Sequence, residues 1–359
     1  MSNQRVEWVD TLRGLGIFVV VYGHQQIEPE PSKYLQLVMV PLFYFASGLV
    51  FHPGKYPNYW TFFKRRFRAL ILPYLIYSVI AWAFWAAVFA WLTFYHGQSK
   101  PGLLLTIFLP LLGIPAGIAK LMPYNLPLWF LTCLFVTDSL FYLLQRKAKS
   151  DGQLLVWMIL LSLLGFVLGL MKGKQLPLPW NADTALTVMV YYGAGFLIRK
   201  RWGLIYPFKW WLKVILCVAG LVGSIYLSTL NPQTHLMNNN IGKWAPFHLT
   251  SVASLVFFVM LAQLIAPTRI FGLLGRNTLP LLGLHVVMMT VWRYFSAQLF
   301  GIDFMKLPHT TPWALWWGTG TVLLIAPFIW LFNRYVPWAV GRPPRAKKGR
   351  EKQGQGSGV

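Results

Sequence analysis

Two side chains with complementary chemistry, Arg13 and His24, lie at the start and near the end of the first apolar stretch. They are eleven residues apart, which in an α-helix is three turns plus roughly 20°, so both project from one face about 16 Å apart along the axis. A guanidinium binds phosphate, and an imidazole can take a proton from a hydroxyl group. The pair predicts a groove for a phosphate-bearing cofactor and a general base. The alternative is that Arg13 is a topology anchor and His24 a hydrogen-bonded packing residue.

A charge inside an apolar stretch is costly and therefore marks a functional candidate, and three further side chains are singled out for this reason. His285 follows Asn277 by eight residues, at a depth comparable to that of His24; it is either a hydrogen-bonding residue between helices or a second reactive imidazole. Asp138 can pair with an arginine or accept a hydrogen bond from a histidine. Arg293 can line an external pocket or extend to the surface.

A basic run, Lys64-Arg65-Arg66-Phe67-Arg68, immediately precedes another apolar stretch. At the start of a helix such a run can hold phosphates through charge, bidentate guanidinium contacts and the helix N-terminus. It can equally be a topology anchor that contacts lipid headgroups, and the residues alone leave both interpretations open.

The composition indicates what kind of element must position these residues. The chain of 359 residues is 56% hydrophobic and 17% aromatic but only 11% charged, and its net charge is +23. A basic nucleic-acid-binding protein would spread its cations over a polar surface, whereas here they form short clusters between long apolar runs. The two cysteines exclude a disulfide framework, and no metal site is expected. We therefore predict a polytopic membrane protein and no nucleic-acid partner.

A membrane-spanning helix needs about 20 mostly apolar residues. The sequence predicts an all-α bundle of about ten such helices. Residues 101–119 are also apolar, but the prolines and glycines within them predict a re-entrant or interfacial segment instead. The predicted spans are 11–27, 34–52, 68–95, 126–145, 153–171, 182–198, 209–229, 247–266, 277–300 and 312–333.

The distribution of basic residues supports this count. Alternate connections, together with the two terminal regions, hold 24 of the 32 Lys and Arg residues, the opposite connections hold seven, and Arg293 lies within a span. Because basic residues concentrate on the cytoplasmic side, both termini are predicted to be cytoplasmic. We expect residues 1–335 to form the membrane domain and residues 336–359 to be a disordered basic tail.

Five sequence blocks, in this order, resemble the acyltransferase-3 family of integral membrane O-acyltransferases, which includes sugar O-acetylases of the fucose 4-O-acetylase kind. Thr278 and Leu282 depart from the family's usual Ser and Tyr, and Pro280 enters the first turns of the late span. The blocks are Trp8-Val9-Asp10-Thr11-Leu12-Arg13-Gly14 with Gly23-His24, the run Pro41–Gly48, the basic run before Pro73-Tyr74, Leu128-Trp129-Phe130-Leu131, and Gly275-Arg276-Asn277-Thr278-Leu279 ending at His285.

The resemblance implies transfer of an acyl group, usually acetyl, from acetyl-CoA to a hydroxyl of a sugar in a cell-surface glycan or its lipid-linked precursor. It implies the inner (cytoplasmic) membrane of a bacterium as the location, with membrane lipids as further partners. By this analogy His24 is the catalytic base or a transient acyl carrier, with Arg13 and His285 beside it. Arg13 orients the donor, whose phosphates are held by Lys64, Arg65, Arg66, Arg68 and Arg276.

Two other classes of function remain open from the residues. A transporter or flippase for a lipid-linked sugar also uses intramembrane His, Asp and Arg residues, although no inverted repeat is evident between the two halves. A signalling or assembly component without chemistry would leave the intramembrane histidines unexplained.

Overall fold

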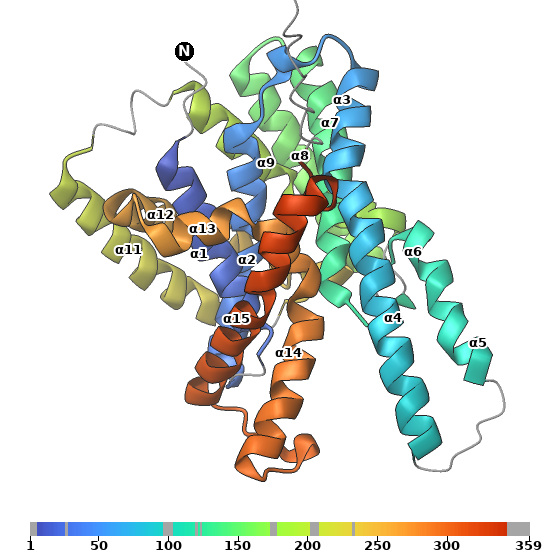
Figure 1. Ribbon diagram of the computed structural model, residues 1–359. Coiled ribbons are helices and arrows are strands. Elements are labelled where there is room, and N and C mark those ends of the chain that lie inside the picture. Colours follow the sequence, from blue (N-terminus) through green and yellow to red (C-terminus); the bar gives the residue numbers. More distant parts are fainter. Residues whose placement is uncertain are drawn as a thin grey trace, which may run out of the picture.

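The computed structural model describes residues 6–25, 28–95, 103–118, 121–122, 124–172, 178–201, 208–231 and 234–342. Within these residues the protein is an all-α bundle, as predicted (Figure 1). A long helix forms at each of the ten predicted spans. These helices are α1 (Glu7–Gly23), α2 (Pro29–Val50), α4 (Leu72–Tyr95), α7 (Trp129–Lys147), α8 (Asp151–Lys172), α9 (Ala182–Lys200), α11 (Trp210–Thr229), α12 (Trp244–Ile265), α14 (Thr278–Phe300) and α15 (Thr311–Tyr335).

By length and hydropathy, the described residues contain seven candidate membrane spans, or eight if α14 and the short helix before it count as one. The predicted number of ten is therefore too high by this measure. Two predicted spans, α1 and α9, are not among the candidates, because α1 has only 17 residues and α9 carries buried polar residues such as Asp183, Thr184 and Thr187. Neighbouring helices enclose both, so fewer of their residues face lipid.

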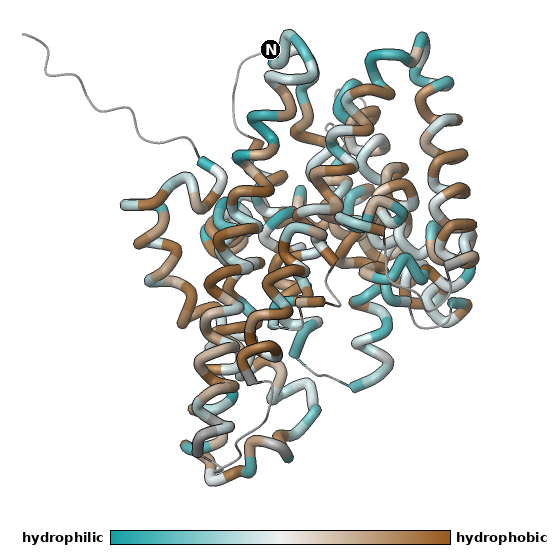
Figure 2. Tube along the Cα trace, turned by 90° about the vertical axis from the view of Figure 1, so that its right-hand side faces the viewer, coloured by the Kyte–Doolittle hydropathy of each residue, from teal (hydrophilic) through white to brown (hydrophobic). Residues whose placement is uncertain are grey.

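Hydrophobic residues predominate along the helices, and many of the connections are hydrophilic (Figure 2). The chain enters α1 at the same end as the connection between α2 and α3, whereas the connection between α14 and α15 lies at the opposite end (Figure 1). This arrangement agrees with the alternation of basic connections. Which end faces the cytoplasm stays a prediction.

The basic run lies in the middle of a continuous helical segment, and this corrects the prediction that it opens a helix. The segment begins with α3 (Tyr59–Arg66), continues through one π-helical turn, η2 (Phe67–Ile71), and becomes α4. Asn58 caps its N-terminus by accepting a hydrogen bond from the Thr61 amide (2.9 Å). The N-terminal amides that could bind a phosphate are therefore at Tyr59 and not at Lys64.

The apolar stretch 101–119 forms only short pieces. They are α5 (Leu103–Phe108), a 3₁₀ turn η3 (Leu109–Leu112) and α6 (Gly113–Ala116). Together they are shorter than a span, as the interrupting glycines and prolines predicted. The Trp82 indole of α4 donates to the Ile107 carbonyl (2.9 Å) and ties this segment to the bundle.

One helix was not predicted. Helix α13 (Arg269–Arg276) was assigned to a connection, but it packs across α1 and then turns by 87° into α14. Glycines permit this crossing: a Cβ on Gly14 would lie 1.9 Å from the Phe271 carbonyl oxygen, and one on Gly275 would lie 1.8 Å from the Asp10 carbonyl oxygen. The two backbones are thus in direct contact, as small residues allow between membrane helices.

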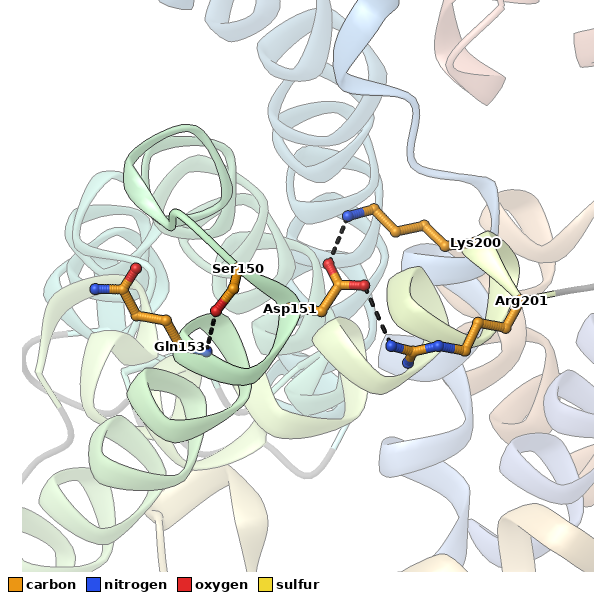
Figure 3. A network of polar contacts seen from close by, with 5 residues as sticks. All are labelled: Ser150, Asp151, Gln153, Lys200 and Arg201. Atoms are coloured by element: carbon orange, nitrogen blue, oxygen red, sulfur yellow. Dashed lines mark hydrogen bonds and ion pairs between the residues drawn. The ribbon is translucent and has the colours of Figure 1, made fainter.

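Helices α8 and α9 form an antiparallel pair that is joined at its exposed end by ion pairs (Figure 3). Asp151, at the start of α8, accepts from the Lys200 ammonium (2.7 Å) and the Arg201 guanidinium (3.4 Å) at the end of α9. The Ser150 hydroxyl accepts from the Gln153 amide and caps α8. Because these groups are exposed, each ion pair contributes at most about 1 kcal/mol.

The folded part extends further than the predicted domain boundary at residue 335. Residues Pro337–Val340 form a 3₁₀ turn in which Ala339 and Val340 are buried. Arg342 donates to the Arg276 carbonyl (2.9 Å) and to Asn333. Residues 337–342 are thus packed against the bundle, and the rest of the predicted disordered tail lies outside the described residues.

Candidate active site

A cavity of about 570 Å³ lies inside the bundle. Its wall includes residues of α1, α2, α7, the segment from Arg66 to Leu70, the turn 234–237 and the start of α14. Arg13 and His24 both line it, so the face that they share on α1 opens into the interior and not into lipid. This volume is within the usual range of small-molecule sites.

His24 caps the C-terminus of α1. Its Nδ1 donates to the Val20 carbonyl oxygen (2.7 Å), since a carbonyl can only accept. In the neutral imidazole this bond leaves Nε2 with its lone pair, which is the state that a general base requires. The sequence spacing predicted the shared face, but not this tautomer.

His285 on α14 lies beside His24, with ring centroids 5.0 Å apart and an angle of 69° between the planes. Its Nδ1 is within hydrogen-bond distance of the Leu282 and Leu281 carbonyl oxygens (2.9 and 3.2 Å). Its Nε2 is buried and has no hydrogen-bond partner in the described part of the chain. The two imidazole rings therefore lie next to each other, and Nε2 is the unprotonated nitrogen in each of them.

Arg66 is the member of the basic run that reaches the cavity. It forms an ion pair with the fully buried Asp138 of α7. Of the two partners that the sequence left open for Asp138, an arginine or a histidine, the structure shows the arginine. The π-helical turn after Arg66 carries the exposed Arg68 and joins α3, which holds Lys64 and Arg65, to the apolar α4. Arg66 and Arg13 thus bring two guanidinium groups to one cavity.

The other predicted donor-binding cations are exposed. Lys64 and Arg68 lie on the outer side of the helix, and Arg65 stacks over the Tyr56 ring at 5.6 Å. Arg276 borders a smaller hollow of about 150 Å³ together with Arg13 and Thr278. Arg13 therefore connects this hollow with the main cavity.

Arg293 lies away from the cavity. It is 8% exposed, and its guanidinium carbon is 4.7 Å from the centre of the Trp317 ring, which itself packs in a small cluster with Ala297 and Leu307. It neither extends to the surface nor, among the described residues, lines the main cavity.

Several polar residues of the cavity wall were not predicted as site residues, among them Gln36, Thr234 and His235. Gln36 lies in an apolar helix, while the other two lie in a polar connection that resembles any other loop. Within the described ranges, the cavity included, no group of three or more His, Cys, Asp or Glu residues is placed to hold a metal ion.

The fold and the cavity define a polytopic membrane protein with a chamber in its bundle that is lined by a histidine and two arginines. A family model described as an acyltransferase domain matches residues 6–334, and the chain belongs to this family, acyltransferase 3. It is therefore a membrane acyltransferase. Comparisons with curated proteins and with solved structures gave no match.

Proposed function

We propose that this acyltransferase moves an acetyl group from acetyl-CoA to a hydroxyl of a sugar, in a cell-surface glycan or its lipid-linked precursor. The observation that carries the proposal is that the His24 imidazole and the Arg13 and Arg66 guanidinium groups line one cavity. The guanidinium groups suit the phosphates of a charged thioester donor, and the imidazole suits the hydroxyl group of a neutral acceptor.

In the proposed reaction the His24 Nε2 takes the proton of the acceptor hydroxyl. The alcohol oxygen then attacks the thioester carbonyl carbon, the carbon–sulfur bond breaks, and the thiolate that leaves recovers the proton from His24. The Val20 carbonyl supports this step because its hydrogen bond to Nδ1 stabilises the imidazolium form. Exclusion of water from the chamber limits hydrolysis of the thioester.

The cations suit the phosphates of the donor. Arg13 and Arg66 line the main cavity, and Arg276 borders the adjoining hollow. Lys64, Arg65 and Arg68 lie on the same helical segment as Arg66. In this proposal Arg13 and Arg66 orient the inner part of the donor, while the exposed cations attract its phosphates. The donor then enters from the end that holds the basic connections, which we assign to the cytoplasm of a bacterial inner membrane.

The experiment is acetyl transfer by the purified protein in lipid nanodiscs, which contribute no sugar hydroxyls. Radiolabelled acetyl-CoA and a panel of methyl hexopyranosides serve as substrates, and labelled sugar ester is the expected product. Uptake of a lipid-linked sugar into vesicles without any dependence on acetyl-CoA would support a flippase and overturn the proposal.

A further inference from the structure

We propose that Gln36, Thr234 and the turn His235–Met237 form the acceptor-binding subsite of this enzyme, which takes a polyhydroxyl compound such as a sugar. The inference rests on the proposed function and deepens it. It assigns the polar atoms that recognise the acceptor, as distinct from those that bind the donor or perform the chemistry.

The first support is position along the cavity. Helices α1 and α2 run antiparallel: Gly16 faces Leu42, and Gly23 faces Leu35 and Met39. Gln36 therefore lies at the level of His24. Arg13 is eleven residues earlier on α1, about 16 Å along the axis. Gln36 is thus close to the reactive imidazole along the axis, whereas Arg13 lies about three helical turns away from both.

The second support is the hydrogen-bonding state of the wall. Gln36 Oε1 and Thr234 Oγ1 are both buried, and neither has a hydrogen-bond partner among the described residues. The Gln36 amide nitrogen donates to the Ser32 hydroxyl (3.3 Å), which leaves Oε1 as the available atom. Thr234 is only 1% exposed, so its hydroxyl is not satisfied by bulk water.

Buried polar atoms in native proteins are normally paired, so two unpaired ones on a cavity wall indicate a missing partner. A carbonyl oxygen only accepts a hydrogen bond, while a threonine hydroxyl both donates and accepts. A sugar offers several hydroxyl groups that can donate to Gln36 and accept from Thr234 at the same time. Trp129 and Phe130 also line the cavity, and their aromatic rings can pack against the apolar C–H face of a sugar ring.

The third support is that the turn His235–Met237, which directly follows Thr234, is held by hydrogen bonds from another element. The Asn181 side-chain amide donates to the Met237 carbonyl (2.6 Å), and the Thr184 hydroxyl donates to the Leu236 carbonyl (3.1 Å). Asn181 lies in the 3₁₀ turn before α9, and Thr184 lies in the first turn of α9. A turn fixed by side chains of another element keeps its polar atoms in place before the ligand binds, as a recognition site requires.

The test measures KM separately for donor and acceptor in the nanodisc assay, with whichever methyl hexopyranoside the wild type acetylates. Gln36→Leu and Thr234→Val should each raise the acceptor KM about tenfold or more, because each leaves a sugar hydroxyl without its partner. The KM for acetyl-CoA should stay within about twofold. Thr234→Ser keeps the hydroxyl and should restore the acceptor KM.

The matched control is Thr229→Val at the exposed end of α11, whose hydroxyl bonds only its own helix in the described structure. It should leave both KM values unchanged. Should Gln36→Leu fail to fold, Gln36→Asn withdraws the amide by one methylene and should also raise the acceptor KM. If Gln36→Leu or Gln36→Asn and Thr234→Val keep the wild-type acceptor KM, the subsite is wrong. If the wild type acetylates no sugar, the proposed function fails instead.

Discussion

At the scale of single residues, two imidazoles in contact present the same nitrogen. His24 and His285 each direct Nδ1 to a carbonyl oxygen of the preceding helical turn, so Nε2 is the basic atom in both. Backbone carbonyls set this tautomer without any charged partner. Once the His24 Nε2 has taken a proton from the acceptor, the neutral His285 imidazole beside it can stabilise the added charge, which supports a role for His285 next to the base.

His285→Ala should lower kcat for acetyl transfer about 10- to 100-fold with little change in the KM for acetyl-CoA, because the ring acts on the chemical step. Steady-state kinetics in nanodiscs measure this effect. A variant with the wild-type kcat would show that His285 only fills space.

Arg13→Lys should weaken acetyl-CoA binding about tenfold, because an ammonium group cannot reproduce the bidentate fork of a guanidinium. Isothermal titration of the purified protein with coenzyme A provides the measurement. Arg269→Lys, on an exposed residue at the start of α13, is the matched control. An unchanged affinity in Arg13→Lys would remove Arg13 from the donor site.

At the scale of elements, the position of Arg13 depends on the contact between α1 and α13. Gly275 meets the Asp10 carbonyl, one turn before Arg13. Gly275→Ala should reduce stability by about 1–3 kcal/mol, since neither backbone can move away without repacking. It should also weaken donor binding.

Thermal unfolding in detergent measures this effect. Gly223→Ala in helix α11 is the control. A Cβ at Gly223 would lie 3.9 Å from its nearest neighbour, the Ala253 side chain of α12, which is ordinary contact distance. That variant should be neutral or slightly stabilising. Equal melting temperatures for Gly275→Ala and the wild type would contradict the close contact.

The connection after α2 should make stability depend on pH. Burial, and then the charges of Arg199 and Lys55, lower the pKa of His52, and the Arg199 guanidinium donates to the His52 ring. As pH falls below about 6.5, the unfolded chain binds more protons than the folded chain does. Stability should therefore decrease on acidification.

His52→Gln removes the titrating group, so the melting temperature should fall less in the variant than in the wild type between about pH 7.5 and pH 5.5. Differential scanning fluorimetry measures both curves. The same drop in both proteins would show that another group is responsible.

At the scale of the whole molecule, hydropathy predicted where helices form, because burying apolar residues in lipid dominates the sequence pattern. Fewer helices meet the length and hydropathy of a span than it predicted, because α1 has only 17 residues and α9 carries buried polar side chains. It missed α13, which is too short and too polar to be recognised as a membrane helix, yet packs against α1 through glycines.

The candidate site was predictable to the extent that it lies on one helix. The spacing of Arg13 and His24 predicted their common face, because helical geometry is regular. The partner of Asp138 and the contact between His24 and His285 depend on how different helices pack, which periodicity does not encode. The wall residues Gln36 and Thr234 carry no local signal at all.

The most direct test of this account is acetyl transfer from labelled acetyl-CoA by His24→Ala compared with the wild type, in protein shown by gel filtration and thermal unfolding to be folded. The account predicts that transfer to the sugar acceptor falls to background while coenzyme A still binds. Transfer at the wild-type rate by the folded variant would contradict it.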